Sequence, residues 1–327
     1  MNQQLQEKCQ LFIANRDAIK ENFKWENEYI IPACSMLYTE KDTLADKEAL
    51  MQCNDIVKKE AGIFSNFRGN VKMVLITKME LSDNPKQYFD KVVKIYNLLK
   101  KDKWCASEYT VIAAMTIADY EGDSEPEEIV EKVRILYAQM KENHPFLTSE
   151  EDTSFAALLA MSELEELEVL EEMEICFNAL KPKFSSSNAV QSLSHILALD
   201  TRDTEAKCRG VLELYELLKK KGKKYDSSSL SILGGLNMID LPNEELVSEI
   251  VEVDEYLKKQ KGFGVFGIGG SQRLLYATAL VMNSYTSERT NMQAMVLTST
   301  VAVMIAEQMA MMAAIMAANA SMAASSN

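Results

Sequence analysis

A short string, an aromatic residue followed three positions later by Leu or Met and then by lysine, recurs along the chain. It begins at Tyr96, Tyr137, Phe177 and Tyr215, with a weaker copy at Tyr256. The separations are 41, 40, 38 and 41 residues. A fixed period of this size, carried by helical patterns, is typical of stacked helix pairs of HEAT or armadillo size. The sequence therefore predicts an all-α fold, an α-solenoid of about five helix-hairpin repeats with helical caps.

Each predicted repeat combines a short apolar helix with a longer amphipathic one. In one long helix, Ile129, Val133, Leu136 and Met140 form a single apolar stripe between charged positions. The short helices carry few charges and are expected at 71–79, 111–118, 155–161, 190–198 and 230–238. A helix that is apolar nearly all round has to be buried, so the short helices are predicted to be the inner members of each pair.

The predicted organisation follows the limits of the repeat. The four predicted parts are a helical N-terminal cap at 1–69, the repeat array at 70–261, a Gly-rich loop with a closing helix at 262–290, and a Met/Ala-rich C-terminal helix and tail at 291–327. Terminal units of helical arrays are usually atypical, because one of their faces meets solvent. One continuous array is therefore preferred to two separate domains.

Charge and cysteine usage limit the partners and the compartment. The chain of 327 residues has a formal net charge of −14, which argues against nucleic acid and against anionic membrane surfaces as partners. Its six cysteines show no C-x-x-C spacing, so free and mostly buried thiols are expected rather than disulfides. The first 20 residues lack the pattern of a signal peptide, which predicts a cytoplasmic protein.

The glycine run from Gly262 to Gly270 contains G-x-G-x-x-G, the pattern of a dinucleotide-binding loop. Here it follows a Lys-rich helix end instead of a strand, so no cofactor site is predicted. We expect a tight loop whose Phe263, Val265 and Phe266 fold back onto the last repeat. As an alternative, the loop covers a groove or cavity.

The tail from Asn291 to Asn327 is rich in methionine and alanine and has one charged residue, Glu307. Three interpretations stay open. A membrane span is long enough but is interrupted by polar residues. Copper capture by thioethers is conceivable for a methionine cluster. The favoured interpretation is a long helix that closes the array or packs on another copy of the chain, which would make it a homo-oligomer contact.

Little in the sequence points to catalysis. His144 is expected in a helix-ending turn, and His195 in an inner helix, where a core histidine is favoured over a Cys–His pair with Cys176 or Cys208. No metal-ligand spacing is present, so neither a metal nor a cofactor is predicted and catalytic residues are not assigned. Seven glutamates between Glu163 and Glu174 are consistent with a cation or basic-peptide site, but a solvated outer face is favoured.

Several of these features together resemble a bacterial uncharacterised domain family, the one numbered four thousand and three. They are the Phe64-x-x-Phe67-Arg68-Gly69 lead-in, the repeated Tyr-x-x-Leu-Lys helix ends, the glycine run before Arg273, and the Ala-rich tail. The resemblance covers nearly the whole chain. It implies a bacterial cytosolic helical protein of unknown function and supplies no catalytic residues.

These observations favour a non-catalytic helical-repeat scaffold whose concave groove binds a protein or peptide partner. One alternative is a small-ligand-binding protein or enzyme with a cavity closed by the Gly262–Gly270 loop. Another is a structural protein that self-assembles through residues 291–327. The candidate partner or ligand contacts are Phe67, Arg68, Phe263, Phe266 and Arg273.

Overall fold

The computed structural model describes residues 1–24, 29–62, 65–101, 106–120, 124–162, 164–264 and 267–285. Within these ranges the chain forms fourteen α-helices and two short 3-10 helices, η2 (Lys181–Lys183) and η3 (Ser227–Ser229), and no strand. The prediction of an all-α protein is confirmed for this part of the chain. The predicted tail at 291–327 lies outside the described residues.

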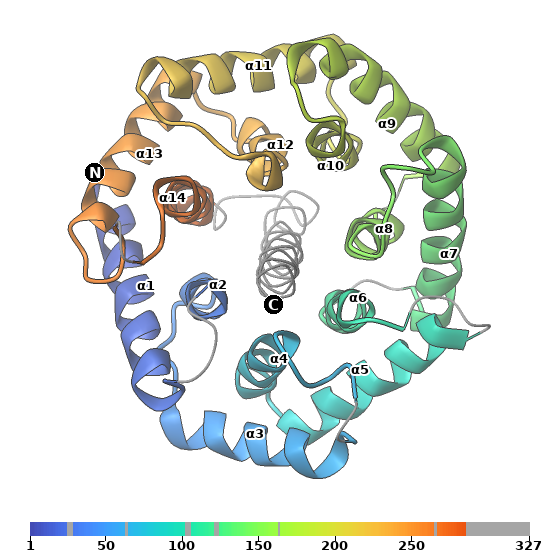
Figure 1. The fold of residues 1–327 in the computed structure, drawn as a ribbon, viewed down its shortest axis with the longest axis vertical. Coiled ribbons are helices and arrows are strands. Elements are labelled where there is room, and N and C mark those ends of the chain that lie inside the picture. Colours follow the sequence, from blue (N-terminus) through green and yellow to red (C-terminus); the bar gives the residue numbers. More distant parts are fainter. Residues whose placement is uncertain are drawn as a thin grey trace, which may run out of the picture.

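The helices alternate along the chain between an outer and an inner layer of a ring (Figure 1). The outer helices are α1 (Gln3–Asn22), α3 (Lys47–Glu60), α5 (Pro85–Lys100), α7 (Pro126–Asn143), α9 (Glu166–Leu180), α11 (Thr204–Lys220) and α13 (Asn243–Lys258). The inner helices are α2 (Ile30–Glu40), α4 (Val71–Glu80), α6 (Glu108–Ala118), α8 (Asp152–Ala160), α10 (Ser187–Leu197), α12 (Ile232–Asn237) and α14 (Gly270–Ser284). In the view of Figure 1 the outer helices run around the rim and the inner helices are seen end-on.

The first and last described helices lie side by side, so the ring is closed. Helix α14 contacts both α1 and α2. The Gln4 side chain also donates a hydrogen bond to the carbonyl of Ser284, over 3.2 Å. An open solenoid of about five repeats is therefore not confirmed. The domain limits proposed above stay predictions.

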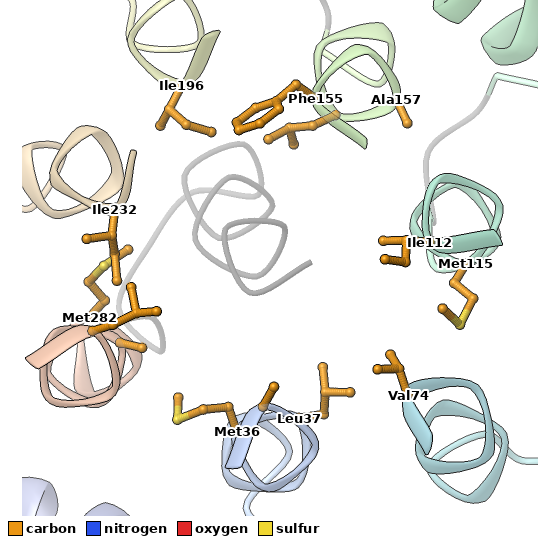
Figure 2. Close-up of a cluster of buried hydrophobic side chains, with 14 of the residues drawn as sticks. Met36, Leu37, Val74, Ile112, Met115, Phe155, Ala157, Ile196, Ile232 and Met282 are labelled. Carbon is orange, nitrogen blue, oxygen red and sulfur yellow. The ribbon is translucent and has the colours of Figure 1, made fainter. Parts of the chain in front are cut away.

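The inner helices are buried because their sequences are apolar nearly all round. In α6, every residue from Thr110 to Ala118 is buried, and Ser107 begins the helix with a capping box. Buried side chains of the inner helices point toward the middle of the ring, among them Met36, Ile112 and Phe155 (Figure 2). The inner layer therefore lines the centre of the ring with apolar groups.

The outer helices bury only one stripe each. In α7 the buried residues are Ile129, Val130, Val133, Leu136 and Met140, and the glutamates of its first turn are exposed. This division matches the amphipathic pattern of the sequence.

The recurring aromatic string has a structural basis in the outer helices. The ring of Tyr96 packs edge-on against Phe67, with 4.9 Å between centroids, and the residue three positions later, Leu99, is fully buried. The lysine of the string then returns over the ring, since the Lys100 ammonium lies 5.8 Å from the Tyr96 centroid. Lysines cover Phe177 and Tyr215 in the same way. A lysine four residues after an aromatic residue shields its exposed face by a cation–π contact.

The seam between the two ends of the ring is an aromatic cluster. The ring of Phe12 in α1 lies 6.0 Å from Phe263, in the loop before α14, and 5.6 Å from Tyr276 in α14. The Arg16 guanidinium lies 5.0 Å above the Phe263 ring and donates a 2.6 Å hydrogen bond to the carbonyl of Lys261. This seam closes the ring.

Two further observations concern the described residues as a group. Their helices are each too short or too polar to cross a bilayer. The five cysteines among them are buried and form no disulfide, as expected, while Cys105 lies outside the described ranges.

The seam predicts the effect of removing the aromatic side chain of Phe263. Phe263→Ala should lower the free energy of unfolding by about 3–5 kcal/mol, because a fully buried phenylalanine leaves a cavity. Urea denaturation followed by circular dichroism measures the change. The matched control is Phe146→Ala, because Phe146 is 99% exposed, and it should change stability by less than about 0.5 kcal/mol. Equal losses in the two variants would contradict the assigned role of Phe263.

Candidate functional site

Phe67 and Arg68 are used for internal contacts of the first hairpins. Phe67 is buried between Tyr96 and Phe89. The Arg68 guanidinium donates to the carbonyls of Lys58 and Ala61, over 2.8 and 2.7 Å, where α3 ends. A hollow of about 270 Å³ beside Arg68 is lined by Val57, Lys58, Arg68, Gly69 and Lys72. The guanidinium therefore caps a helix end, and its edge borders this hollow.

Phe263 lies against α1, across the seam of the ring, whereas the sequence suggested that it folds back onto the last repeat. Its ring is buried against Phe12 and Arg16, so it is not exposed to a partner. Val265 and Phe266 lie outside the described residues, so their predicted contacts remain predictions.

The glycine loop is shaped by a close backbone approach. Gly262 has a φ of 88°, in the region that favours glycine, and its carbonyl accepts a 2.9 Å hydrogen bond from the amide of Ile268. A Cβ atom placed on Gly267 would lie 2.2 Å from that carbonyl oxygen. The loop thus needs glycine at both positions in order to hold Phe263 in the seam.

Arg273 takes part in a buried ion cluster. Its Nε donates a 2.7 Å hydrogen bond to the carboxylate of Asp254, a side chain that is 1% exposed. Lys223 binds the same carboxylate and that of Glu255. Burial lowers the pKa of Lys223, but its hydrogen bonds to Asp254 and Glu255 outweigh that effect and raise it. A charge cluster of this kind joins α13 to α14 and is costly to break.

The His195 side chain of α10 is buried against α8. Its ring packs edge-on against Phe155, 5.0 Å between centroids, and its Nδ1 lies 3.8 Å from the Asp152 carboxylate. Burial lowers the pKa of His195 to about 3 and raises that of Asp152 to about 7. Both nitrogens of the ring lack a hydrogen-bond partner. The favoured sequence interpretation, a core histidine, agrees with this burial.

A solvent-facing apolar stripe lies over α7, the turn that follows it and α9, on the face where the sequence predicts solvated glutamates. Phe146 is 99% exposed, Leu167 81%, Ile175 45% and Ile135 44%. These are four of the seven large apolar side chains that are exposed in the described part of the chain. We call these four residues the α7–α9 stripe.

Contacts between the two helices bring the members of the stripe together. The Lys132 ammonium lies 3.9 Å from the carboxylate of Glu166, which brings the turn of α7 that carries Ile135 close to the start of α9, where Leu167 lies. Further along, the Asn143 amide and the His144 ring both contact the carboxylate of Glu174, over 3.4 and 2.9 Å. This second junction lies beside Phe146 and Ile175. The stripe therefore follows the line where α7 meets α9.

The stripe is bordered by acidic groups. Glutamates stand at 166, 168, 171, 172 and 174 of α9, which has no lysine or arginine between Glu166 and Leu180. Glu131 and Glu142 add exposed carboxylates on α7. No group of three or more His, Cys, Asp or Glu side chains in the described ranges is arranged to hold a metal ion. The arrangement is suited to a partner that is both apolar and basic.

The sequence pattern pointed to the glutamates of this face. One of them, Glu163, lies outside the described residues. The sequence pattern, in which Leu167 is interleaved with the glutamates, predicts a core position for this residue; that prediction is wrong, because Leu167 is 81% exposed, and the stripe was therefore missed. A usable signal was present: Leu167 and Ile175 are eight residues apart and fall outside the buried positions of α9, which are Val169, Leu170, Met173, Cys176, Phe177 and Leu180.

The glycine loop predicts a position-specific effect. Gly267→Ala should destabilise the protein by about 1–3 kcal/mol, because its Cβ would meet the Gly262 carbonyl and force the backbone to shift. Gly264→Ala is the matched control, since a Cβ there meets no atom within 4 Å. Thermal unfolding of both variants tests this, and an unchanged melting temperature for Gly267→Ala would argue against the close approach.

The Asp152–His195 pair predicts a pH dependence of stability. Asp152 holds its proton in the folded state up to about pH 7, against an ordinary pKa of 3.8, so its contribution to stability falls as pH rises between these values. His195, with its pKa near 3, contributes the opposite trend up to about pH 6.5. In the wild type the contributions of these two groups should therefore largely cancel where they overlap.

Asp152→Asn removes one of the two opposing effects. Urea unfolding at a series of pH values should then show a slope of stability against pH that is more positive than that of wild type by about 1.4 kcal/mol per pH unit between pH 4 and 6, because the opposing contribution of Asp152 is gone. The control is Asp83→Asn, at an exposed position, which should keep the wild-type pH profile. Parallel pH profiles for wild type and Asp152→Asn would rule out the raised pKa of Asp152.

Comparison with known proteins identifies an uncharacterised relative that matches over nearly its whole length, and a family without a characterised function. The chain is 24% identical over 328 residues to the uncharacterised protein YeaA of Bacillus subtilis (strain 168), a match that covers 97% of this chain and 96% of that protein. No solved structure matches the present chain. The model of a family described as "Protein of unknown function (DUF4003)" matches residues 15–310. The resemblance seen in the sequence is thus confirmed, and the chain belongs to the DUF4003 family.

Proposed function

We propose that this protein is a non-catalytic scaffold that binds a protein partner through the α7–α9 stripe. The observation that carries the proposal is the exposure of Phe146, Leu167, Ile135 and Ile175 along one helix junction. Large apolar side chains that gather on one exposed region and stay in water are unfavourable for a monomer, and such regions, rimmed by polar residues, mark interaction sites. Aromatic side chains are especially enriched in such contacts.

The charges around the stripe support a basic partner. α9 carries five glutamates and no basic residue, and the whole chain has a net charge of −14. An amphipathic helix with an apolar face and flanking lysines or arginines would bury the stripe and pair with these carboxylates. The long-range attraction would speed association and be weakened by salt.

In this proposal the partner binds the outer rim and does not enter a concave groove. We interpret the ring as an array of helix hairpins of the solenoid type whose two ends have joined. Its concave side is turned toward the centre, where inner-helix side chains such as Met36 and Ile112 are buried. Four of the seven exposed large apolar side chains of the described residues lie on or next to the outer helices α7 and α9.

Other parts of the functional hypothesis stay as predictions. They are the cytoplasmic location, the absence of nucleic-acid and membrane partners, and the absence of a cofactor. A small-ligand or enzymatic role for a cavity under the Gly262–Gly270 loop also remains an alternative. Self-assembly through residues 291–327 concerns a segment outside the described residues.

The proposal is tested with a defined peptide. An 18-residue helical peptide of leucine and lysine, labelled with fluorescein, should bind the full chain, as measured by fluorescence anisotropy. The double variant Ile135→Ser with Ile175→Ser should weaken binding at least about tenfold, since it removes roughly 1.4 kcal/mol or more of apolar contact.

The matched control is Leu44→Ser with Met51→Ser, which removes two other exposed apolar side chains from a different part of the ring. It should leave the affinity unchanged. A second control peptide with glutamate in place of lysine should not bind. The proposal is refuted by equal losses in both double variants, or by equal affinity for the two peptides.

A further inference from the structure

The interface between α9 and α11 brings two thiols to the same level of neighbouring helices. One turn earlier, the Thr204 hydroxyl donates a 2.6 Å hydrogen bond to the Glu172 carboxylate. Cys176 is four residues after Glu172, and Cys208 is four residues after Thr204. Positions four apart lie on the same face of a helix, one turn further along. Since both helices advance together, Cys176 and Cys208 face each other across the interface, and their side chains interact directly.

We propose that Cys176 and Cys208 form an oxidisable dithiol, a site at which a peroxide converts two buried thiols into a reversible disulfide. The inference is independent of the α7–α9 stripe. It assigns a chemical modification to the contact between α9 and α11, and the co-reactant is hydrogen peroxide or an organic hydroperoxide. In reducing compartments, disulfides that do form are usually transient and redox-sensing.

The surroundings favour an ionised sulfur at Cys208. The thiol of Cys176 hydrogen bonds to it and the neighbouring Lys207 ammonium attracts negative charge, and together these lower the pKa of Cys208 despite burial. The same hydrogen bond, together with burial, raises the pKa of Cys176. Lys207 is held in place by the Glu172 carboxylate and the Asp200 carbonyl, each 2.7 Å from its amine. A thiolate beside a fixed cation is the usual form of a reactive cysteine.

Two other described thiols lack such an environment. Burial raises the pKa of Cys9 to about 12 and that of Cys53 to about 11, so these sulfurs stay protonated and inert. Cys208 also keeps 6% exposure, whereas Cys9 has none. Of these three thiols, Cys208 is therefore the one whose surroundings favour the nucleophilic thiolate.

The chemistry balances over two steps. The Cys208 thiolate attacks one peroxide oxygen, the O–O bond breaks, and the departing hydroxide takes the proton released by the thiol to become water. Cys208 is then a sulfenic acid. Next, the Cys176 sulfur attacks the Cys208 sulfur while its proton leaves, and Glu172, 3.7 Å from the Cys176 sulfur, is placed to accept it. The S–O bond breaks and a second water forms. Two thiols have lost two electrons and two protons, and the peroxide is reduced to two waters.

The experiment treats the full reduced chain with hydrogen peroxide, alkylates the remaining thiols in denaturant, and maps the peptides by mass spectrometry. Two of the six cysteines should escape alkylation, joined as a Cys176–Cys208 pair, and dithiothreitol should restore both. Cys176→Ser should stop the reaction at the first step, leaving a sulfenic acid on Cys208 that dimedone traps.

Controls separate this site from general oxidation. Cys53→Ser should keep the Cys176–Cys208 crosslink, and Cys208→Ser should abolish it. Cys208→Ala serves as the second variant if the serine variant does not fold, as judged by circular dichroism. Full alkylation of all six cysteines after peroxide, or a crosslink between any other pair in place of this one, would overturn the proposal.

Discussion

The closed ring depends on the contact between its two ends, where Phe263 lies between Phe12 and the Arg16 guanidinium. An open array of helix pairs leaves the apolar side of its first and last units without cover, and such arrays need special capping repeats. Closure removes that requirement because each end covers the other. Gly262 and Gly267 contribute to this closure, since they let the loop turn tightly enough to hold Phe263 against Phe12.

The layer of each helix could be predicted from sequence because burial and composition are linked directly. An inner helix contacts neighbours on all sides, so α6 tolerates no charged residue between Thr110 and Ala118. An outer helix contacts the inner layer along one stripe, so α7 alternates Val133 and Leu136 with charged positions. The aromatic strings were visible for a related reason. At Tyr96, Phe177 and Tyr215 a lysine four residues later covers the ring, which accounts for the spacing at these three positions.

Closure and the candidate surfaces could not be predicted in the same way, because they depend on how distant segments are placed. Phe12 and Phe263 lie outside the recurring string, and neither segment contains a sequence signal that predicts its contact with the other. The stripe depends on which turn of α7 meets which turn of α9, a relation set by helix tilt and not by period. Leu167 illustrates the difficulty, since an isolated leucine among glutamates fits a core position as well as an exposed one.

Helix α9 carries two features on different sides. Its outward side presents Leu167 and Ile175 among glutamates, while its side toward α11 holds Cys176. Glu172 belongs to both, since it is one of the acidic residues of the helix and also binds Lys207 and Thr204 across the interface. Any change in the thiol contact therefore acts on the helix that carries half of the stripe. Because helices pack as rigid units, a shift of α9 against α11 would move Leu167 and Ile175 relative to α7.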